Sequence, residues 1–367
     1  MNLVPAYKNF AANRAVSHIG LGVTALNAVK TMRGAGVNAD IWPIISAPDL
    51  RARLRSSPQT GAPTHIVVSA PWIATQDLAQ LCAEFPNTRF AINCHSNLGF
   101  LQADPNALRL VREGLELSRA TWNFRIAANC ERLARWVEAA YATSCLCLPN
   151  MYHLDQLYTP REPYTCGTLR IGAFGATRAL KNLLTAAGAA LEIANRRAAD
   201  LEFWISSGRN EGAGPVLDAV RQMMNGLAHV RLVENGWQTW PQFRQTVRHM
   251  HLLLQPSYTE SFNVVTADGV AEGVPSVVSH AIDWAPSSWK AEVDDAEDIA
   301  RKGLKLLGSR RAAKQGLEAL KNHNRRAFVQ WMNFLHEPAR TAKIVHGRSN
   351  PPFSLRARLS RRLLPAH

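Results

Sequence analysis

HLLLQPSYTESFNVVTADGVAEGVPSVVS, residues 251–279, contains a complete strand, turn, helix and second strand. The run that starts at Leu252 predicts a short apolar strand, which ends at Pro256. The following VVTADGVAEG predicts a helix with its valines and Ala267 on the buried side, and Gly273 and Pro275 end it. SVVS then begins the next strand, so the stretch predicts one unit of an α/β protein.

Two acidic residues bracket the turn of this unit. Glu260 precedes the predicted helix and Asp268 lies within it, so at ~1.5 Å rise per residue only about two helical turns separate them. Both carboxylates can therefore face one bound molecule, and the helix N-terminus offers free N–H groups to an anion. The structural alternative is a surface Glu beside a helix-capping Asp.

The stretch PSYTESFNVVTADGVAEGVPSVVS resembles the donor-binding signature of retaining GT-B glycosyltransferases of the family 4 type. That signature is an E-x7-E motif followed by a small-residue helix and GVPVV, and this chain departs from it by carrying Asp268 as the second acid. The resemblance implies that Glu260 touches the donor sugar and that Asp268 holds the ribose hydroxyls. It also implies a donor loop formed by Ser261, Phe262 and Asn263. Since Asp reaches one methylene less than Glu, the ribose must lie closer to the helix.

The resemblance implies an α/β fold with two Rossmann-like domains facing a cleft (GT-B) and a C-terminal helix that crosses back to the N-terminal domain. A chain of 367 residues, 47% hydrophobic and 19% charged, suits two globular domains. We expect an acceptor domain at 1–150, a linker at 151–167, a nucleotide-sugar domain at 168–320, a crossover helix at 321–337 and a basic tail at 338–367.

In the first domain, Gly20-Leu21-Gly22 predicts a turn before a helix, where backbone can approach a ligand. The resemblance implies that these glycines face the donor phosphates, although a packing turn has the same sequence. Polar residues also gather where the predicted strand 89–97 ends, at Asn93, His95 and Asn97, and ligands bind at such strand ends in open α/β sheets. His95 matches an active-site His of the family, near the transferred sugar; a structural His is the alternative.

The second domain opens with TLRIGAFGATRALKN, which predicts a strand, a glycine-containing loop and a helix that starts near Leu180. Arg178 and Lys181 lie three residues apart in the first turn of that helix. Two cations at the positive end of a helix dipole favour a diphosphate, and the pair resembles the family's phosphate clamp at a shorter spacing. Two solvated cations are the alternative interpretation.

The net charge of +14 indicates a polyanion or an anionic surface as a partner. Residues 338–367 carry seven basic residues and no acidic one, which is half of this charge. FSLRARLSRRLL in this tail places leucines at four-residue spacing among arginines, a pattern that also suits anionic lipid; a solvated tail is the alternative. A second basic cluster, Arg51, Arg53 and Arg55, predicts either a solvated helix face or part of an acceptor surface.

The cysteines and the apolar runs indicate a cytoplasmic protein. The six cysteines contain no C-x-x-C pair, which favours buried thiols over zinc ligands or disulfides. No apolar run approaches the ~18 residues of a membrane span, and the N-terminus lacks the apolar core of a signal peptide.

The resemblance implies retaining transfer of a hexose from a nucleotide sugar, without a metal or other cofactor. The expected nucleotide sugar is UDP-glucose. His95, Arg178, Lys181 and Glu260 are the expected catalytic residues. The sequence is also similar to short bacteriophage transferases that glycosylate 5-hydroxymethylcytosine in duplex DNA, so we expect that acceptor. The alternative acceptors are a lipid or polysaccharide at a membrane face and a small molecule. The alternative functions are a GT-B nucleotide-sugar epimerase and a non-catalytic DNA-binding or scaffolding protein. The sequence specifies neither the sugar, nor the nucleotide base, nor the oligomeric state.

Overall fold

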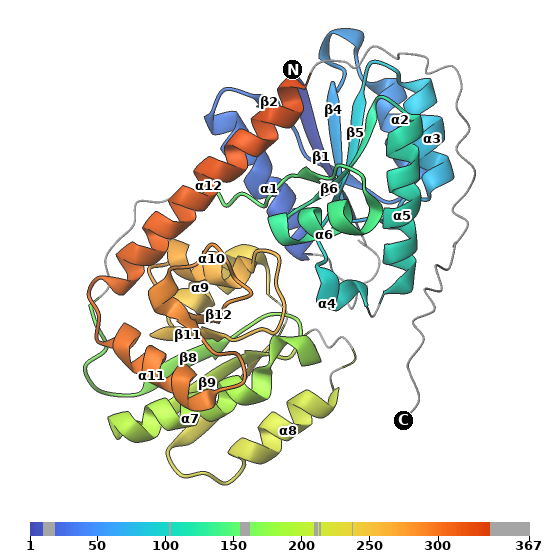
Figure 1. The fold of residues 1–367 in the computed structure, drawn as a ribbon. Coiled ribbons are helices and arrows are strands. Elements are labelled where there is room, and N and C mark those ends of the chain that lie inside the picture. The colour runs from blue at the N-terminus through green and yellow to red at the C-terminus, as the bar shows by residue number, and fades with distance from the viewer. Residues whose placement is uncertain are drawn as a thin grey trace, which may run out of the picture.

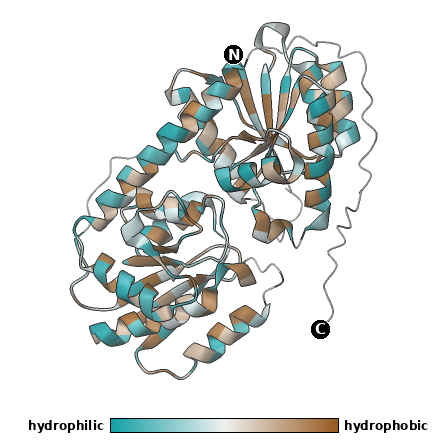
Figure 2. Ribbon diagram, viewed as in Figure 1, coloured by the Kyte–Doolittle hydropathy of each residue, from teal (hydrophilic) through white to brown (hydrophobic). Residues whose placement is uncertain are grey.

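Two parallel β-sheets, each covered by helices on both faces, make up the protein in the computed structural model (Figure 1). The structure describes residues 1–9, 19–102, 104–154, 162–208, 212, 214–236 and 238–337. The first sheet has the order β2-β1-β4-β5-β6-β7, with β3 also paired to β1, and the second has the order β10-β9-β8-β11-β12-β13. Hydrophobic residues concentrate in the strands and on the helix faces that cover them (Figure 2). The α/β fold class predicted from the sequence is confirmed.

The elements that build the two sheets follow one another along the chain. Those of the N-terminal domain are β1 (Asn2–Lys8), α1 (Ile19–Gly34), β2 (Asn38–Ala39), β3 (Trp42–Ile44), α2 (Ala47–Ser56), the 3₁₀ helix η2 (Gln59–Gly61), β4 (His65–Ser69), α3 (Thr75–Glu84), β5 (Arg89–Cys94), α4 (Leu98–Leu101), α5 (Pro105–Ala120), β6 (Phe124–Ala128), α6 (Glu131–Tyr141) and β7 (Leu146–Cys147).

The C-terminal domain is built in the same way and then returns to the first. Its elements are β8 (Leu169–Ala173), η3 (Ala179–Lys181), α7 (Leu183–Arg197), β9 (Leu201–Ser206), α8 (Gly214–Met224), β10 (Val230–Asn235), α9 (Trp240–Arg248), β11 (Leu252–Gln255), α10 (Val264–Ala271), β12 (Ser276–Ser279), η4 (Ser287–Trp289), β13 (Lys290–Ala291), α11 (Ala296–Leu307) and α12 (Ala312–His336). The strand, helix and strand predicted around Glu260 are confirmed as β11, α10 and β12.

Strand β1 was not predicted, and Pro5 explains why. Proline lacks the N–H of a ladder residue and normally argues against an interior strand. On one side β1 pairs with β4, and on the other it pairs with β2 at its beginning and with β3 near its end. Pro5 falls between the two short strands, where no ladder donor is required.

Two helices begin at different residues from those expected. Helix α1 already starts at Ile19, so Gly20 and Gly22 lie in its first turn and not in a turn before it. A Cβ on Gly22 would lie 3.2 Å from the ring of Tyr7, which gives this glycine a packing role. Helix α7 starts at Leu183 because Asn182 adopts a left-handed conformation at φ 57°, which separates the helix from η3.

Helix α12 crosses between the two domains (Figure 1). Toward its C-terminal end, Trp331 donates its indole N–H to the carbonyl of Pro149 at 2.9 Å and packs in a core with α1. Toward its start, Gly316 lets the buried ring of Trp289 approach the helix closely. The crossover was expected at 321–337, and the helix begins nine residues earlier, at Ala312. The expected linker falls partly, at 155–161, and the expected tail entirely, at 338–367, outside the described residues.

Four of the six cysteines are buried in the N-terminal domain. Cys82, Cys94, Cys130 and Cys145 are buried, as expected for core thiols, whereas Cys166 is exposed. Burial raises the pKa of Cys82 and of Cys94 to about 12, so these thiols stay protonated. Within the described ranges, no helix combines the length and apolar character needed to cross a membrane.

Candidate active site

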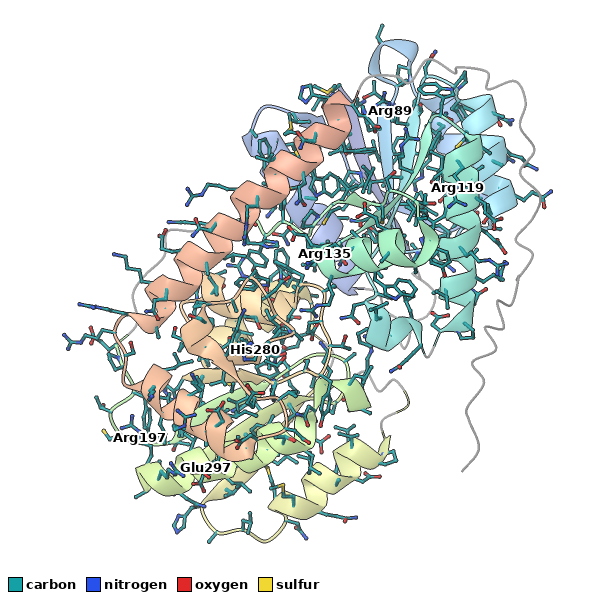
Figure 3. The ribbon with its side chains drawn as sticks, viewed as in Figure 1. Arg89, Arg119, Arg135, Arg197, His280 and Glu297 are labelled. Atoms are coloured by element: carbon teal, nitrogen blue, oxygen red, sulfur yellow. The ribbon has the colours of Figure 1, made fainter. Side chains whose placement is uncertain are left out.

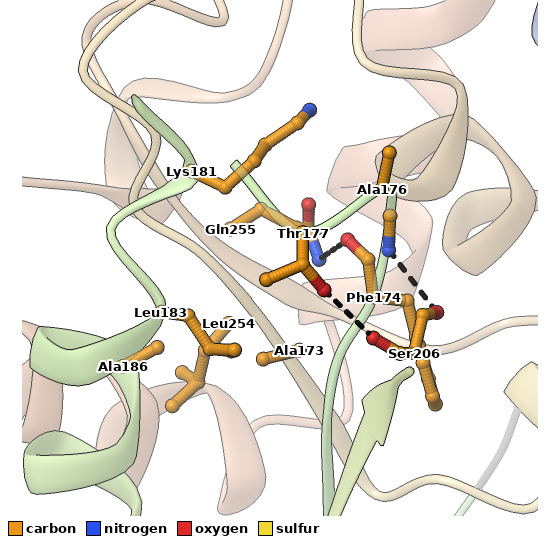
Figure 4. A pocket seen from close by; sticks show the side chains of 11 residues that line it. Ala173, Phe174, Ala176, Thr177, Lys181, Leu183, Ala186, Ser206, Leu254 and Gln255 are labelled. Carbon is orange, nitrogen blue, oxygen red and sulfur yellow. Dashed lines mark hydrogen bonds between the residues drawn. The ribbon is translucent and has the colours of Figure 1, made fainter. Parts of the chain in front are cut away.

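A pocket that is open to solvent lies at the carboxyl ends of β8, β9 and β11 (Figure 4). Open α/β sheets bind ligands at this edge, because loops and helix N-termini meet there. The polar residues that line it are Thr177, Lys181, Ser206 and Gln255.

The loop between β8 and η3 forms one wall of the pocket. Gly175 has a φ of 125°, a conformation that L-residues avoid, and its N–H donates to the Ser206 hydroxyl at 3.3 Å. Thr177 donates to the Ser206 carbonyl at 3.1 Å, as Figure 4 shows. A Cβ at position 175 would lie 3.7 Å from Cε of Lys181. The glycine therefore lets the loop turn tightly beside the lysine side chain.

Lys181, which lines this pocket, forms an ion pair with Glu260. Glu260 is 8% exposed and also accepts a hydrogen bond from Asn263 at 2.9 Å. The Asn263 side chain in turn accepts from the N–H of Thr266 at 2.8 Å, which caps helix α10. The cation, the carboxylate and the helix N-terminus are thus fixed relative to one another.

Residues of the N-terminal domain meet this group across the cleft. Ser261 donates to the backbone carbonyl of His95 at 3.2 Å and accepts from the Asn129 amide at 3.0 Å. Arg178 stacks on the ring of Phe100 in α4, with 4.7 Å between guanidinium carbon and ring centroid. The loop that carries Glu260 is therefore in direct contact with the carboxyl ends of β5 and β6.

His95 is uncharged at neutral pH, because burial lowers its pKa to about 4. Its Nδ1 lies 3.5 Å from the amide nitrogen of Asn129. An amide N–H directed at Nδ1 favours the tautomer in which Nε2 carries the proton. Such a ring can donate a neutral hydrogen bond to a hydroxyl-bearing ligand.

Asp268 lies in the interior, with 1% of its surface exposed. Its Oδ1 accepts hydrogen bonds from Tyr152 at 2.7 Å and from the Trp240 indole at 2.9 Å. Burial raises its pKa to about 7, while these two donors act in the opposite direction. Tyr152 is itself held to α12, because its backbone N–H and carbonyl both bond the Asn324 amide. The second acid of the motif thus lies where α9, α10 and the segment leaving the first domain meet.

The structure brings together Arg178, Lys181, Glu260, Ser261, Asn263 and His95 at the cleft. Asn97 precedes α4, is 2% exposed, and neither of its amide atoms has a hydrogen-bond partner among the described residues.

Other predicted site residues have structural contacts. Asn93 donates to the carbonyl of Leu148 within the first sheet, and the Phe262 ring stacks on buried Trp284. Arg51 and Arg55 pair with Glu84, and Arg53 pairs with Asp49. These arginines lie on α2, on the outer flank of the N-terminal domain away from the other domain (Figure 1).

Several residues of the site were not predicted from the sequence. Asn129 follows β6 as His95 follows β5, so the strand-end rule applied to β6 would have found it. Gly175 follows β8 in a loop that the sequence marks as glycine-containing. No local pattern indicates that Tyr152 and Trp240 contact Asp268, because both are distant in sequence.

The comparisons with known proteins identify the fold. The sequence matches no protein-family model and no curated protein. Among solved structures, sucrose-phosphate synthase from Thermosynechococcus elongatus superimposes with a TM-score of 0.62 at 15% identity, covering 91% of this chain and 98% of that one. A glycosyltransferase from Rickettsia africae gives 0.60 at 10% identity, covering 92% and 98%.

A third structure is a mutant of S. aureus TarM in complex with Fondaparinux, alpha-GlcNAc-glycerol and UDP. It matches with a TM-score of 0.52 at 14% identity over 74% of this chain, which spans 55% of that protein. These likenesses, with two parallel-sheet domains and a cleft between them, show the GT-B fold.

Proposed function

We propose that this protein is a glycosyltransferase that moves a hexose from a nucleotide sugar to an acceptor hydroxyl with retention of configuration. The nucleotide sugar that we propose is UDP-glucose. The observation that carries the proposal is the ion pair of Glu260 with Lys181, a residue that lines the pocket. This pair is in contact, through Ser261, with His95 of the facing domain. One of the similar structures, the mutant of S. aureus TarM, is a complex that contains UDP.

Lys181 and Arg178 stabilise the diphosphate as it gains negative charge, which is where a preorganised cation accelerates the reaction most. The N–H groups at the start of α10, near Phe262 and Asn263, and those at the start of α1, near Gly20 and Gly22, add to this stabilisation. Fixed charges of the protein thus stabilise the negative charge on the diphosphate, and we propose that the reaction needs no metal.

Glu260 binds hydroxyls of the transferred sugar and favours its oxocarbenium-like state. Asp268 binds the ribose, and Tyr152 and Trp240 hold its carboxyl group in position. The acceptor hydroxyl attacks from the face that the diphosphate leaves. The bond between the anomeric carbon and the phosphate oxygen breaks, the new glycosidic bond forms, and the phosphate oxygen takes the acceptor proton. Neutral His95 orients the sugar through Nε2–H.

For the acceptor we propose 5-hydroxymethylcytosine in duplex DNA, which the net charge of +14 supports through phosphate contacts. A lipid or polysaccharide at a membrane face is the second candidate, because the same charge suits an anionic surface.

The test incubates the protein with radiolabelled UDP-glucose and, separately, hydroxymethylcytosine duplex, unmodified duplex and anionic vesicles carrying a glycolipid. Label transferred to one acceptor, with UDP release that needs Lys181 and survives a chelator, is the expected result. Release of a free altered sugar without transfer would support an epimerase, and no release from any nucleotide sugar would refute the proposed chemistry.

A further inference from the structure

A strip of positive charge follows α11 and α12 on the outside of the protein. Residues 301–326 contain nine basic residues and one acidic residue, Glu318. The exposed basic residues, called here the basic strip, are Arg301, Lys305, Arg310, Arg311, Lys314, Lys321, Arg325 and Arg326. This excess of positive charge in residues 301–326 lies entirely outside the basic tail at 338–367.

On α12 the basic strip occupies one face of the helix. Arg311, Lys314, Lys321 and Arg325 are spaced by multiples of three and four residues, so their side chains lie along one side over ~21 Å. The opposite side packs into the protein through the buried residues Gly316, Leu317, Leu320, Ala327 and Trp331.

Few carboxylates neutralise this surface. Arg301 pairs with Asp298, and Lys321 pairs with Glu318. Arg310 reaches Glu162 at 3.7 Å, with both side chains more than four-fifths exposed. Within the described part of the chain, Lys305, Arg311, Lys314 and Arg326 have no acidic partner within 4.0 Å. Such exposed charges repel one another and gain energy from an extended anionic surface.

The position of the strip distinguishes it from the active site. Helix α12 runs along one edge of the molecule, whereas α4, which meets Arg178 at the cleft, lies across the molecule from it (Figure 1). In Figure 3 side chains project outward from the α12 edge, on the side opposite Arg119 of α5. A duplex held on this edge would have to bend around the protein to bring a base to Lys181, and DNA is stiff over ~50 nm.

A bilayer has no such constraint, since it can hold α12 while the cleft opens elsewhere. Val329 adds an apolar side chain that is 57% exposed one turn beyond Arg325. We propose that the basic strip docks the protein on a membrane surface rich in anionic lipid. The proposal does not depend on the transferase chemistry.

The experiment measures co-sedimentation of the full chain with vesicles of pure phosphatidylcholine, with vesicles containing 30% phosphatidylserine, and binding to a 30-base-pair duplex. The strip variant carries Lys314→Glu, Lys321→Glu and Arg325→Glu. The control variant makes the same change in net charge on the outer flank of the N-terminal domain, through Arg53→Glu, Arg55→Glu and Arg112→Glu.

We expect binding to the phosphatidylserine vesicles and none to vesicles of pure phosphatidylcholine. The strip variant should lose at least ~100-fold of this binding, and the control variant should not. UDP release from UDP-glucose without vesicles should be the same in the strip variant and the wild type, which separates this test from that of the proposed function. Three results would overturn the assignment: unchanged vesicle binding in the strip variant, an equal loss in the control, or tighter binding to the duplex that the strip variant abolishes.

Discussion

Ser261 donates a hydrogen bond across the cleft to the backbone carbonyl of His95, 3.2 Å away. The Asn129 amide completes this arrangement by donating to the same hydroxyl at 3.0 Å. Because Ser261 directly follows Glu260, the contact between the two domains is linked to the position of the Glu260 carboxylate. Among the described residues, the hydroxyl forms no hydrogen bond to Lys181 or Asp268, so its removal should leave the proposed nucleotide site intact.

Ser261→Ala should therefore lower kcat by roughly 10- to 30-fold, because the variant cannot form two hydrogen bonds of about 1 kcal/mol each. The dissociation constant for UDP should stay within about twofold, since no diphosphate or ribose contact changes. Steady-state kinetics and calorimetry measure the two quantities. Ser261→Thr keeps the hydroxyl and should restore part of kcat; weaker UDP binding in the Ala variant would place Ser261 in the nucleotide site instead.

Lys181→Ala should lower transfer by at least ~100-fold, since a preorganised charge beside a developing anion typically contributes about 3 kcal/mol. The variant also leaves Glu260 buried without its cation, so thermal unfolding has to be followed in parallel. Lys305→Ala, an exposed lysine on α11, is the matched control. Turnover near that of the wild type in a folded Lys181→Ala protein would remove this residue from the mechanism.

The two acids of the motif should respond differently to neutralisation. Glu260→Gln should reduce sugar transfer more than UDP affinity, because its proposed partner is the sugar. Asp268→Asn should weaken UDP binding first, while its retained oxygen still accepts from Tyr152 and Trp240. Calorimetric titration with UDP and turnover with UDP-glucose separate these effects. Equal losses of UDP affinity in both variants would contradict the assigned roles.

The β11–α10–β12 unit could be predicted from the sequence because each step has a local signal. Apolar runs mark the strands, Gly273 and Pro275 end the helix, and the acids flank the turn. The local rules failed where tertiary context decides. Pro5 is tolerated in β1 because it faces the gap between two short partners, and Asn182 adopts a left-handed conformation that no spacing rule predicts.

For the candidate site, too, local sequence patterns predicted some residues and not others. Lys181 and Glu260 were assigned to one site through their positions in two separate βα units, and the structure pairs them. Asp268 was expected to hold the ribose hydroxyls, but the sequence did not indicate that its Oδ1 accepts hydrogen bonds from Tyr152 and Trp240, which lie 116 and 28 residues away. Contacts of this range depend on how α9 and α12 pack, and a sequence pattern does not contain that information.

The stability of the protein should depend on pH through Asp268. Burial raises its pKa from 3.8 to about 7, so between these values the folded state binds more protons than the unfolded state. Its contribution to the free energy of unfolding is therefore lost as pH rises through this window, by up to about 1.4 kcal/mol per pH unit. Asp268→Asn should gain stability relative to the wild type as pH rises from 5 to 7.

Urea unfolding of both proteins at pH 5, 6, 7 and 8 measures this difference. The pKa of His65 and of His95 is lowered to about 4, so these residues titrate with the opposite sign. They are present in both proteins and cancel in the comparison. A difference that does not vary with pH would show that Asp268 is ionised in the folded protein at pH 5.

The last prediction concerns the basic tail. Deleting residues 338–367 removes seven positive charges and none of the proposed donor residues, so turnover of a saturating acceptor should survive. If the tail binds duplex DNA, affinity should fall and the slope of log affinity against log salt should become shallower by about 0.9 for each phosphate that the tail neutralises. If the tail binds lipid, the deletion should weaken vesicle binding and leave the duplex slope unchanged. A full-length control with glutamine at the seven basic positions separates charge from chain length, because only a charge effect appears in both variants. An unchanged slope together with unchanged vesicle binding would assign neither partner to the tail, and the basic strip on α11 and α12 would then be the surface on which to look for the anionic partner.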